Sequence, residues 1–560
     1  MSHDPTLLNI LARGLQSASE EMAANLIRSA FSSVVREARD CSTALLDTRG
    51  RVVAQAEMIP IQTAGLSASF AAAARQLDLS AIDRDHFVIL NDPYSGGQHL
   101  NDIILFTPIF QDGEHLGWAG STAHHLDIGG GASGVNTNAT ELIQEGLIIP
   151  PLLCRRDRDW NGGMIGRLIF ANIRTPVIGM GDLDAQFAAN QTGVARVAEF
   201  ALRYGAGTVR AAMDAAMDYS ERRMRAAIAE IPDGTWTGEA LMDGDGLSLE
   251  QVPIRVFVTV TVTGTEAVID FTGTDPQANS MINSPMASSF AGAVTALRAV
   301  LNDTQMPAND GCNRPLTIVI PDGTILNPWP GAAVRARATS SCRALDAVHD
   351  ALGKVIPDRV PGQGMNATTG LYLSWAPPGR AQVIQSDILG GGWGGALDYD
   401  AIHATDHILS SCLLTPTESL EQLNPHMRIE GFGLIQDSWG AGQFNGGMGI
   451  YRRYRILDDH VKLSLYSDRF RLPPLGREGG CNGSRAKLFV LRGGQRLALT
   501  ATSTFITRKD DIVEMRLAGG GGWGPPEARN REAVARDLAD GLISERAADT
   551  LYAYHPAPGP

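Results

Sequence analysis

The chain has 560 residues, of which 44% are hydrophobic and 19% charged, and its formal net charge is −14. This composition excludes global disorder, because enough apolar side chains are present for a large core, and the length suits roughly two to four domains of about 100–200 residues. The acidic balance argues against a nucleic-acid binder or an anionic-membrane binder, since contacts with phosphate groups require clustered cations.

Three kinds of segment are missing from the sequence. No apolar run reaches the ~18 residues of a membrane-spanning helix, and residues 1–5 lack the basic region and apolar stretch of a signal peptide. None of the four lysines stands in a Gly-Lys-Ser/Thr context, which excludes a P-loop. We therefore expect a cytoplasmic protein with no membrane contact and no nucleotide site of that kind. The six cysteines form no Cys-x-x-Cys pair, so we expect buried thiols.

The first part of the chain alternates between helix and hairpin patterns. Apolar residues recur near the helical period over residues 5–36, which predicts one long helix. Strands 43–47 and 51–56 then flank a turn at residues 48–50, and an Ala-rich helix follows at 66–77. Further strands are predicted at 86–91, 102–110 and 116–124, helices at 182–204, 207–230 and 287–301, and a hairpin at 253–262 and 265–271.

The pattern beyond residue 310 predicts a β-rich region. Beyond residue 310, short apolar strands alternate with Gly, Pro and Asn turns as far as about residue 517, and two helices follow at 531–540 and 545–554, with Ser544 as the N-cap of the second. Two glycine clusters, at 390–394 and 520–524, are interpreted as tight turns. We therefore predict a mixed α+β fold with antiparallel hairpins in an N-terminal region (1–235), a β-rich region (236–525) and a short helical tail (526–560).

The most informative stretch is the hairpin formed by residues 102–124. If its turn is centred between Asp112 and Gly113, paired positions sum to about 225, and Asp102 faces residue 123, give or take one. His99 precedes Asp102 by three residues, and the returning strand ends in His124 and His125. Successive side chains of a strand point to opposite faces, so only one of these two histidines can join Asp102 and His99, and spacing alone does not choose between them.

Imidazole and carboxylate groups without a thiolate suit zinc, manganese or iron(II) at a site with an open position. The alternative is a hairpin end whose polar side chains are simply hydrogen-bonded. A competing pair, His403 and His407, lies within a predicted helix at 401–411. A nucleophilic triad is disfavoured, because no Gly-x-Ser-x-Gly motif occurs and nothing places a histidine beside a cysteine.

Several motifs in this stretch resemble a known family. Residues 91–102 (Asn-Asp-Pro-Tyr-Ser-Gly-Gly-Gln-His-Leu-Asn-Asp) and 123–130 (Ala-His-His-Leu-Asp-Ile-Gly-Gly) are similar to the B subunit of the hydantoinase/oxoprolinase family. More motifs follow in that family's order, at residues 144–146, 171–176, 181–183, 231–234, 270–273, 306–309 and 519–524. The resemblance covers roughly residues 5–553.

The resemblance carries expectations about the site. In the carboxylase branch of the family, a His-x-x-Asp pair and a histidine 25 residues after the first hold the metal, which implies His99, Asp102 and His124 here, since 124 − 99 = 25. Residues 39–42, Arg-Asp-Cys-Ser, match the family's Arg-Asp-Phe-Ser and suggest Asp40 as a fourth ligand. Asp127 or Glu145 would serve as a base or would orient a ligating histidine.

Other implications concern partners and chemistry. The resemblance implies one divalent metal ion (zinc or manganese, or else iron), a hydantoinase A-like ATPase subunit that binds ATP, and a hetero-oligomer such as α2β2. The expected reaction is ATP-dependent opening of a small cyclic amide, a hydantoin or lactam. The alternatives are a subunit of an ATP-dependent ketone carboxylase and a non-catalytic scaffold for the ATPase.

The sequence departs from the family pattern at two positions and in length. Gln62 stands where many members have a histidine, which leaves the role of that position open, and Gln98 replaces a usual threonine. The chain is also much shorter than the carboxylase alpha subunits, which favours the hydrolase branch.

Overall fold

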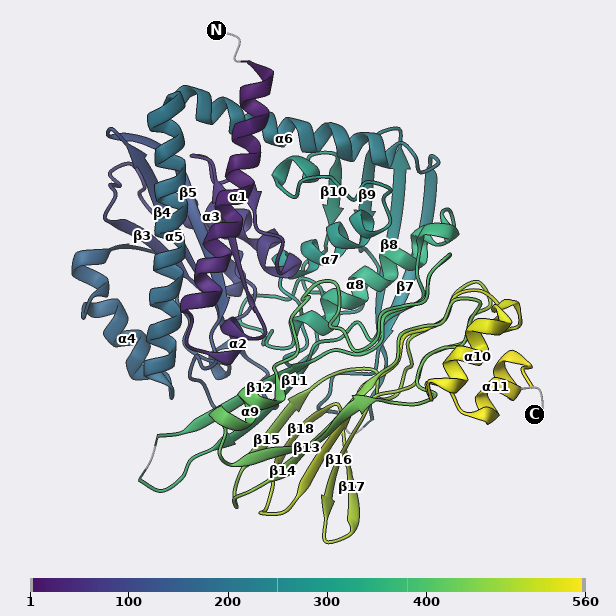
Figure 1. Cartoon of the computed structure of the whole chain (residues 1–560). Helices are drawn as coiled ribbons and strands as arrows, with labels where there is room; N and C mark the ends of the chain where they lie inside the picture. The colour runs from purple at the N-terminus through teal and green to yellow at the C-terminus, as the bar shows by residue number, and fades with distance from the viewer. Residues whose placement is uncertain (1–3, 249, 380, 556–560) are drawn as a thin grey trace. The chain divides into compact units, whose positions relative to one another are not determined.

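The computed structural model describes residues 4–248, 250–379 and 381–555, and it has the predicted mixed α+β fold with antiparallel sheets and a short helical C-terminal tail (Figure 1). The chain forms two compact units. The first runs to Trp236 and resumes at Val258–Arg337, and the second comprises Thr237–Phe257 and the chain from Ala338 onward. Residues 258–337 thus group with the N-terminal part of the chain rather than with the β-rich part that follows them.

The elements up to residue 319 alternate between helices and hairpins. The helices are α1 (Pro5–Ser29), α2 (Ser33–Arg36), α3 (Pro60–Gln76), α4 (Met164–Asn172), α5 (Pro176–Tyr204), α6 (Ala206–Ile228) and α7 (Met286–Ala299). The strands are β1 (Cys41–Leu46), β2 (Val52–Gln55), β3 (His86–Leu90), β4 (Asp102–Gln111), β5 (Glu114–His124), β6 (Leu152–Arg155), β7 (Gly234–Met242), β8 (Ile254–Thr263), β9 (Glu266–Asp270) and β10 (Leu316–Val319).

The elements after residue 319 are mostly strands. The helices are α8 (Arg337–Leu352), α9 (Thr417–Leu423), α10 (Arg531–Ala539) and α11 (Glu545–Tyr552). The strands are β11 (Thr369–Trp375), β12 (Val383–Leu389), β13 (Met427–Leu434), β14 (Ile450–Ile456), β15 (Lys462–Tyr466), β16 (Lys487–Arg492), β17 (Gln495–Leu499), β18 (Thr502–Ile506) and β19 (Ile512–Arg516). Among the described helices, none combines the length and the apolar character that a membrane crossing requires.

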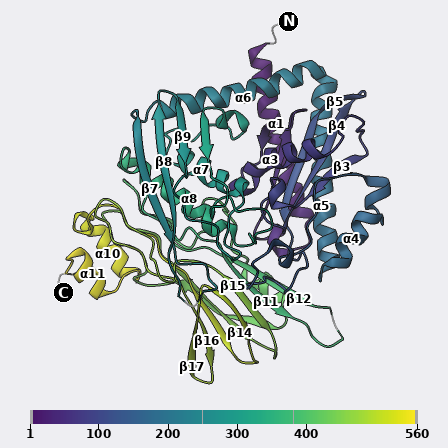
Figure 2. The same ribbon diagram turned by 180° about the vertical axis from the view of Figure 1, so that it is seen from behind.

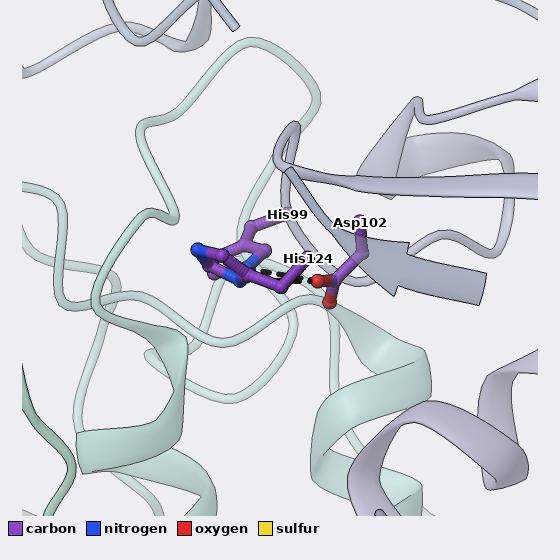
Figure 3. Close-up of side chains that lie close together, drawn as sticks. All are labelled: His99, Asp102 and His124. Carbon is purple, nitrogen blue, oxygen red and sulfur yellow. Dashed lines mark hydrogen bonds and ion pairs between the residues drawn. The ribbon is translucent and has the colours of Figure 1, made fainter. Parts of the chain in front are cut away.

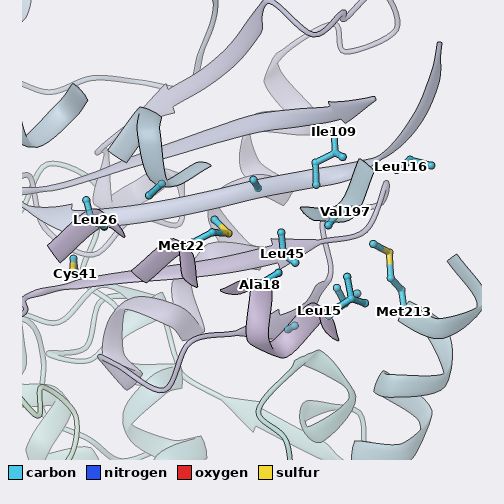
Figure 4. Packing of buried hydrophobic residues seen from close by; sticks show 14 of the residues in the cluster. Leu15, Ala18, Met22, Leu26, Cys41, Leu45, Ile109, Leu116, Val197 and Met213 are labelled. Carbon is cyan, nitrogen blue, oxygen red and sulfur yellow. The ribbon is translucent and has the colours of Figure 1, made fainter. Parts of the chain in front are cut away.

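A six-stranded antiparallel sheet, in the order β2-β1-β5-β4-β3-β6, organises the first unit. Helix α3 covers one face, where Leu66 and Phe70 pack with Phe106 of β4. Helices α1 and α5 lie side by side on the other face (Figures 1 and 2). There Leu15 and Met22 of α1 share a buried cluster with residues of β1, β5 and α5 (Figure 4). The sheet is therefore buried on both faces.

The predicted single helix over residues 5–36 is wrong in one respect, because it ends at Ser29 and a short helix, α2, follows. The carboxylate of Asp182, on α5, accepts hydrogen bonds from the backbone amides of Phe31 (2.7 Å) and Ser32 (3.0 Å). These two amides therefore cannot donate the i to i−4 hydrogen bonds of a continuous helix. The Ser32 side chain instead caps the N-terminus of α2. A distant residue overrides a local helical pattern here.

The β4–β5 hairpin contains a β-bulge that sets the register at its far end. Next to the turn, Phe110 pairs with His115, as the predicted centre of the turn requires. Ile109 pairs with Gly117, however, so Leu116 is an extra residue and every later pair is displaced by one. Gly117 adopts φ +146°, and a Cβ atom there would overlap the carbonyl oxygen of Leu46. The displaced register places Asp102 opposite His124.

The second unit has two antiparallel sheets, ordered β12-β11-β15-β18 and β13-β14-β19-β16-β17, which contribute to one buried core. The prediction missed α8 in this part of the chain. Its sequence hides the helical period, because Ser340, Ser341, Arg343 and Asp346 are buried together with the apolar residues. Arg343 and Arg469 both contact Asp346 at 2.8 Å, which makes the burial of these charges tolerable.

The glycine clusters are not tight turns, so that interpretation is wrong. Neither segment forms a hydrogen-bonded turn, and the two segments lie against each other. The amide of Gly395, just after the first cluster, donates to the Gly521 carbonyl oxygen at 2.9 Å, and the Gly392 amide donates to the carbonyl oxygen of Ala518, just before the second cluster, at 3.0 Å. A Cβ atom on Gly394 would overlap the carbonyl oxygen of Gly362. Glycine is needed because backbone packs directly on backbone.

Candidate metal centre

Three buried side chains converge at one end of the six-stranded sheet. His99 lies in the loop after β3, Asp102 is the first residue of β4, and His124 is the last residue of β5 (Figure 3). Their exposed fractions are 2%, 0% and 5%. Asp102 and His124 are cross-strand partners on the same face of the sheet. His99 joins them because the loop turns tightly, with the Asp102 amide donating to the His99 carbonyl oxygen at 2.9 Å.

The facing atoms of these side chains have the spacing of metal ligands. The Nε2 atom of His99 lies 3.3 Å from the Oδ1 atom of Asp102, as does the Nδ1 atom of His124, and the two nitrogens are 3.0 Å apart. Ligand atoms about 2.1 Å from one ion, at angles of about 90–110°, are about 3.0–3.4 Å apart. The three side chains can therefore hold a divalent ion as they stand, and they form a group of potential metal ligands within 4.8 Å.

The protonation states also suit a ligand set. Burial, reinforced by the charge of Arg337, lowers the pKa of His99 well below its usual value, so the imidazole is neutral near pH 7. The Nδ1 atom of His99 lies 3.0 Å from the carbonyl oxygen of Arg335, a contact that leaves Nε2 free to face its neighbours. Burial alone would raise the pKa of Asp102, but interactions with His99 and Arg337 outweigh it and lower that pKa well below its usual value.

Asp40, the predicted fourth ligand, lies next to this group. It precedes β1, and its carbonyl oxygen accepts a hydrogen bond from the His124 amide at 3.0 Å. Its Oδ2 atom is 3.6 Å from the Nδ1 atom of His124. Its other carboxylate oxygen accepts a hydrogen bond of 2.8 Å from the side-chain amide of Gln62, on α3. The structure thus groups three of the four predicted residues and places Asp40 beside them, next to His124, and the role of all four as ligands stays a prediction.

His125 is separated from the group, as the alternation of side chains requires. Its Nε2 atom lies 3.0 Å from the Oε1 atom of Gln186, on α5 at the opposite face of the sheet. The same Gln186 side chain donates to the carbonyl oxygen of Ile103 at 3.0 Å. Of the two histidines that the spacing left open, His124 therefore lies with His99 and Asp102.

Sequence reasoning missed two buried arginines at this centre. The guanidinium of Arg337 lies 2.6 Å from the Oδ2 atom of Asp102 and 2.7 Å from the Nδ1 atom of His99. Arg335 lies 3.4 Å from the same Nδ1 atom and 3.5 Å from the Nε2 atom of His124. Both contact outer atoms of the candidate ligands. No local pattern in the sequence points to them, because 236 residues separate Arg335 from His99.

The two predicted catalytic carboxylates lie in the surrounding loops. Asp127 accepts hydrogen bonds from the backbone amide and the guanidinium of Arg174, the latter at 3.1 Å. Glu145 accepts from the amides of Val334 (3.0 Å) and Arg335 (2.8 Å), and burial raises its pKa to about 7. Glu145 thus positions the segment whose carbonyl oxygen contacts His99, and the catalytic role of either carboxylate stays a prediction.

The competing pair of histidines lies elsewhere and not on a helix, so the helix predicted at 401–411 is wrong. His403 accepts a hydrogen bond from the Met448 amide at 3.0 Å. His407 lies 3.3 Å from the sulfur of Cys342, a proximity that the sequence did not reveal. Burial raises the pKa of Cys342 well above its usual value, so this cysteine is a protonated thiol and a poor nucleophile.

Comparisons with known proteins bear on the whole chain. The sequence model of the hydantoinase B/oxoprolinase family matches residues 4–526. A protein of Pseudomonas sp. (strain NS671), provisionally named as the B subunit of a D-/L-hydantoinase, is 30% identical over 570 residues, which cover 98% of this chain and 95% of that protein. The crystal structure of the ATP-dependent caprolactamase from Pseudomonas jessenii has a TM-score of 0.91 at 28% identity and covers 99% of this chain and 96% of that one.

A third comparison concerns the fold alone. A nucleotide-free structure of acetone carboxylase has a TM-score of 0.88 at 19% identity, and the match covers 98% of this chain and 79% of that chain. The match of the family model over nearly the whole length, together with the relative at 30% identity, is decisive. The chain belongs to the hydantoinase B/oxoprolinase family.

Proposed function

We propose that this chain is the metal-bearing component of an ATP-dependent cyclic amide hydrolase, which opens a hydantoin-like or lactam ring after a partner ATPase has activated it. The observation that carries the proposal is the buried convergence of His99, Asp102 and His124 in a member of this family. The named relatives support it, since one is called the B subunit of a hydantoinase and another an ATP-dependent caprolactamase.

The ion would be held by the Nε2 atom of His99, the Nδ1 atom of His124 and the Oδ1 atom of Asp102, with the Oδ2 atom of Asp40 as a fourth ligand. Two nitrogen and two oxygen donors suit zinc or manganese, and also iron(II). When bound, such an ion acts as a Lewis acid and lowers the pKa of a water molecule from ~15.7 towards ~7.

The surrounding residues define the rest of the chemistry on this chain. Glu145 fixes the backbone of Val334 and Arg335, and Arg335 in turn orients the His99 ring. With a pKa of about 7, the Glu145 carboxyl group can also exchange a proton near neutral pH. Asp127 anchors the loop after β5 through Arg174. We assign both carboxylates to positioning or proton transfer around the ring-opening step.

The partner would supply the ATP-dependent activation of the substrate. An unstrained amide is a poor electrophile, so its oxygen would be phosphorylated on the partner ATPase, directly or after carboxylation by bicarbonate. That step converts a poor leaving group into a good one. We infer a hetero-oligomer, of the α2β2 type, in which ATP is bound by a hydantoinase A-like partner and this chain completes ring opening.

Neither alternative is favoured by a specific observation. The likeness to acetone carboxylase shows the fold alone, and does not argue for ketone carboxylation. A non-catalytic scaffold would not require two histidines and an aspartate whose facing atoms lie 3.0–3.3 Å apart in a buried position.

The test is the ratio of phosphate released to ring-opened product in the reconstituted complex, with Asp102→Asn compared with the wild type. The amide removes one anionic ligand, so product formation should fall by orders of magnitude, while phosphorylation on the partner survives in part. Phosphate release should therefore exceed product. Asp310→Asn serves as a control, because its carboxylate bonds to Ser67 and the Val52 amide, outside the centre. A variant with the wild-type ratio and rate would refute the proposal.

A further inference from the structure

We propose that Gln62 is a positioning residue of the candidate metal centre. Its side-chain amide bridges the carboxylates of Asp40 and Asp102, presents Asp40 as the fourth ligand, and takes no coordination position itself. The inference rests on the metal site of the proposed function and assigns a role to a side chain that the sequence left without one. The inference is drawn from the hydrogen bonds that Gln62, on α3, makes with Asp40, Asp102 and Ser42 of β1, and not from the ligand set alone.

The contacts of Gln62 place it between two candidate ligands. Gln62 is the third residue of α3 and is 1% exposed. Its Nε2 atom lies 2.8 Å from the Oδ1 atom of Asp40 and 3.5 Å from the Oδ1 atom of Asp102. A side-chain amide nitrogen carries two hydrogens, so this one group can donate to both carboxylates.

The orientation of the amide is set by a residue on the neighbouring strand. The hydroxyl of Ser42, on β1, donates to the Oε1 atom of Gln62 at 3.0 Å, and the hydroxyl oxygen accepts from the Ile59 amide at 3.3 Å. Ser42 is fully buried. A carboxylate oxygen can only accept a hydrogen bond, and the Ser42 hydroxyl is able to donate to Oε1. The nitrogen of the amide is therefore the end that faces Asp40 and Asp102.

This arrangement has two physical consequences. Before an ion arrives, two buried carboxylates close together repel each other, and a shared donor offsets part of that repulsion. The donor also occupies the Oδ1 atom of Asp40, so that Oδ2 is the oxygen that faces the Nδ1 atom of His124, at 3.6 Å. Gln62 therefore orients the Asp40 carboxylate so that its Oδ2 atom is the one available to a metal ion.

The amide also limits the number of protein ligands. An NH2 group that donates hydrogen bonds does not coordinate a cation, whereas a carboxylate at position 62 would compete for the ion. With Gln62 oriented as it is, the protein would offer two nitrogens and two oxygens, and an ion that takes more than four ligands would have room for water and substrate.

The experiment compares three variants of the full chain by chelator competition for zinc and by the absorption spectrum of the cobalt(II)-loaded chain, which reports coordination number. Gln62→Leu removes both donated bonds at similar volume and should weaken metal binding about 10–100-fold. Gln62→Glu adds a carboxylate and should shift the cobalt spectrum towards a higher coordination number. Ser42→Ala frees the amide to rotate and should weaken binding several-fold, less than Gln62→Leu.

Gln186→Leu is the matched control, since Gln186 is an equally buried glutamine that bonds His125 and Ile103 on the other face of the same hairpin. It should leave the affinity and the spectrum unchanged. The inference is overturned if Gln62→Leu binds within twofold of the wild type with the same spectrum, or if Gln186→Leu loses as much affinity. If Gln62→Leu does not fold, wild-type affinity in Ser42→Ala overturns it. If the wild-type chain binds no metal, the proposed function itself fails.

Discussion

Asp102 lies opposite His124, and not opposite Ala123, because Leu116 is an extra residue in β5. The turn of the hairpin pairs residues that sum to 225, and the bulge changes that sum to 226 for every pair from Ile109 to Asp102. Because side chains alternate along a strand, this displacement selects His124 for the candidate metal centre and directs His125 towards α5.

The first prediction contrasts these two neighbours. His124→Gln should lose the divalent metal, because a facing nitrogen 3.3 Å from Asp102 is removed, whereas His125→Gln should keep it, because its ring bonds Gln186 on the other face. Elemental analysis of the purified chains measures the metal, and circular dichroism checks that both variants fold. Metal lost from His125→Gln and kept in His124→Gln would show that the register is wrong.

The second prediction concerns ATP. The isolated chain should not bind ATP with useful affinity, since it has no P-loop and its glycine clusters are already engaged. The amides of Gly392 and Gly395 donate to the carbonyl oxygens of Ala518 and Gly521, so they are not available to a phosphate group. Isothermal titration calorimetry with Mg-ATP should show no heat of binding, and tight binding to this chain alone would contradict the assignment of ATP to the partner.

The third prediction is a pH dependence of stability from His426. Burial lowers the pKa of this imidazole to about 4, against about 6.5 in an unfolded chain. Between those pH values the unfolded chain binds a proton that the folded chain does not, so stability falls as the pH drops through this window, by about 2 kcal/mol at pH 5. His426→Asn should lose this part of the pH dependence, as measured by thermal unfolding at pH 7.5 and pH 5.

His460→Asn is the control for that measurement, because His460 is exposed. It should keep the pH dependence of the wild type. If His426→Asn shows the same loss of stability on acidification as the wild type, the buried imidazole is not its source.

The fourth prediction tests the packing of the glycine clusters. Gly394→Ala should destabilise the protein by about 1–3 kcal/mol or more, because the added methyl group overlaps the carbonyl oxygen of Gly362 and backbone cannot move aside as a side chain can. Gly207→Ala is the matched change, since Gly207 lies in α6 with open space around its Cα atom. It should leave stability unchanged or raise it by up to about 1 kcal/mol, as thermal unfolding would show.

Local patterns predicted much of the fold. The hairpin strands β1–β2, β4–β5 and β8–β9 and helices α6 and α7 lie where alternation and helical period placed them, and Ser544 caps α11. Two of the misses share a cause. The break after α1 depends on Asp182, and the burial of polar residues in α8 depends on Arg469, more than 100 residues further along the chain. A local pattern cannot report such contacts.

By itself, the sequence determined which side chains are available, the short spacing that puts His99 beside Asp102, and the hairpin that returns two histidines to the same end. The strand spacing left open which histidine faces Asp102, and the family resemblance implied His124. The tertiary structure supplies the physical reason, because the extra residue Leu116 shifts the register beside Gly117, where a Cβ atom would overlap the Leu46 carbonyl oxygen. It also decided the surroundings of the centre. Arg335 and Arg337 lie more than 200 residues further along the chain than His99 and Asp102, which they contact. Gln62, on α3, contacts Asp40, which precedes β1. A buried charge requires polar partners within about 3 Å, and only the folded chain determines which residues those partners are.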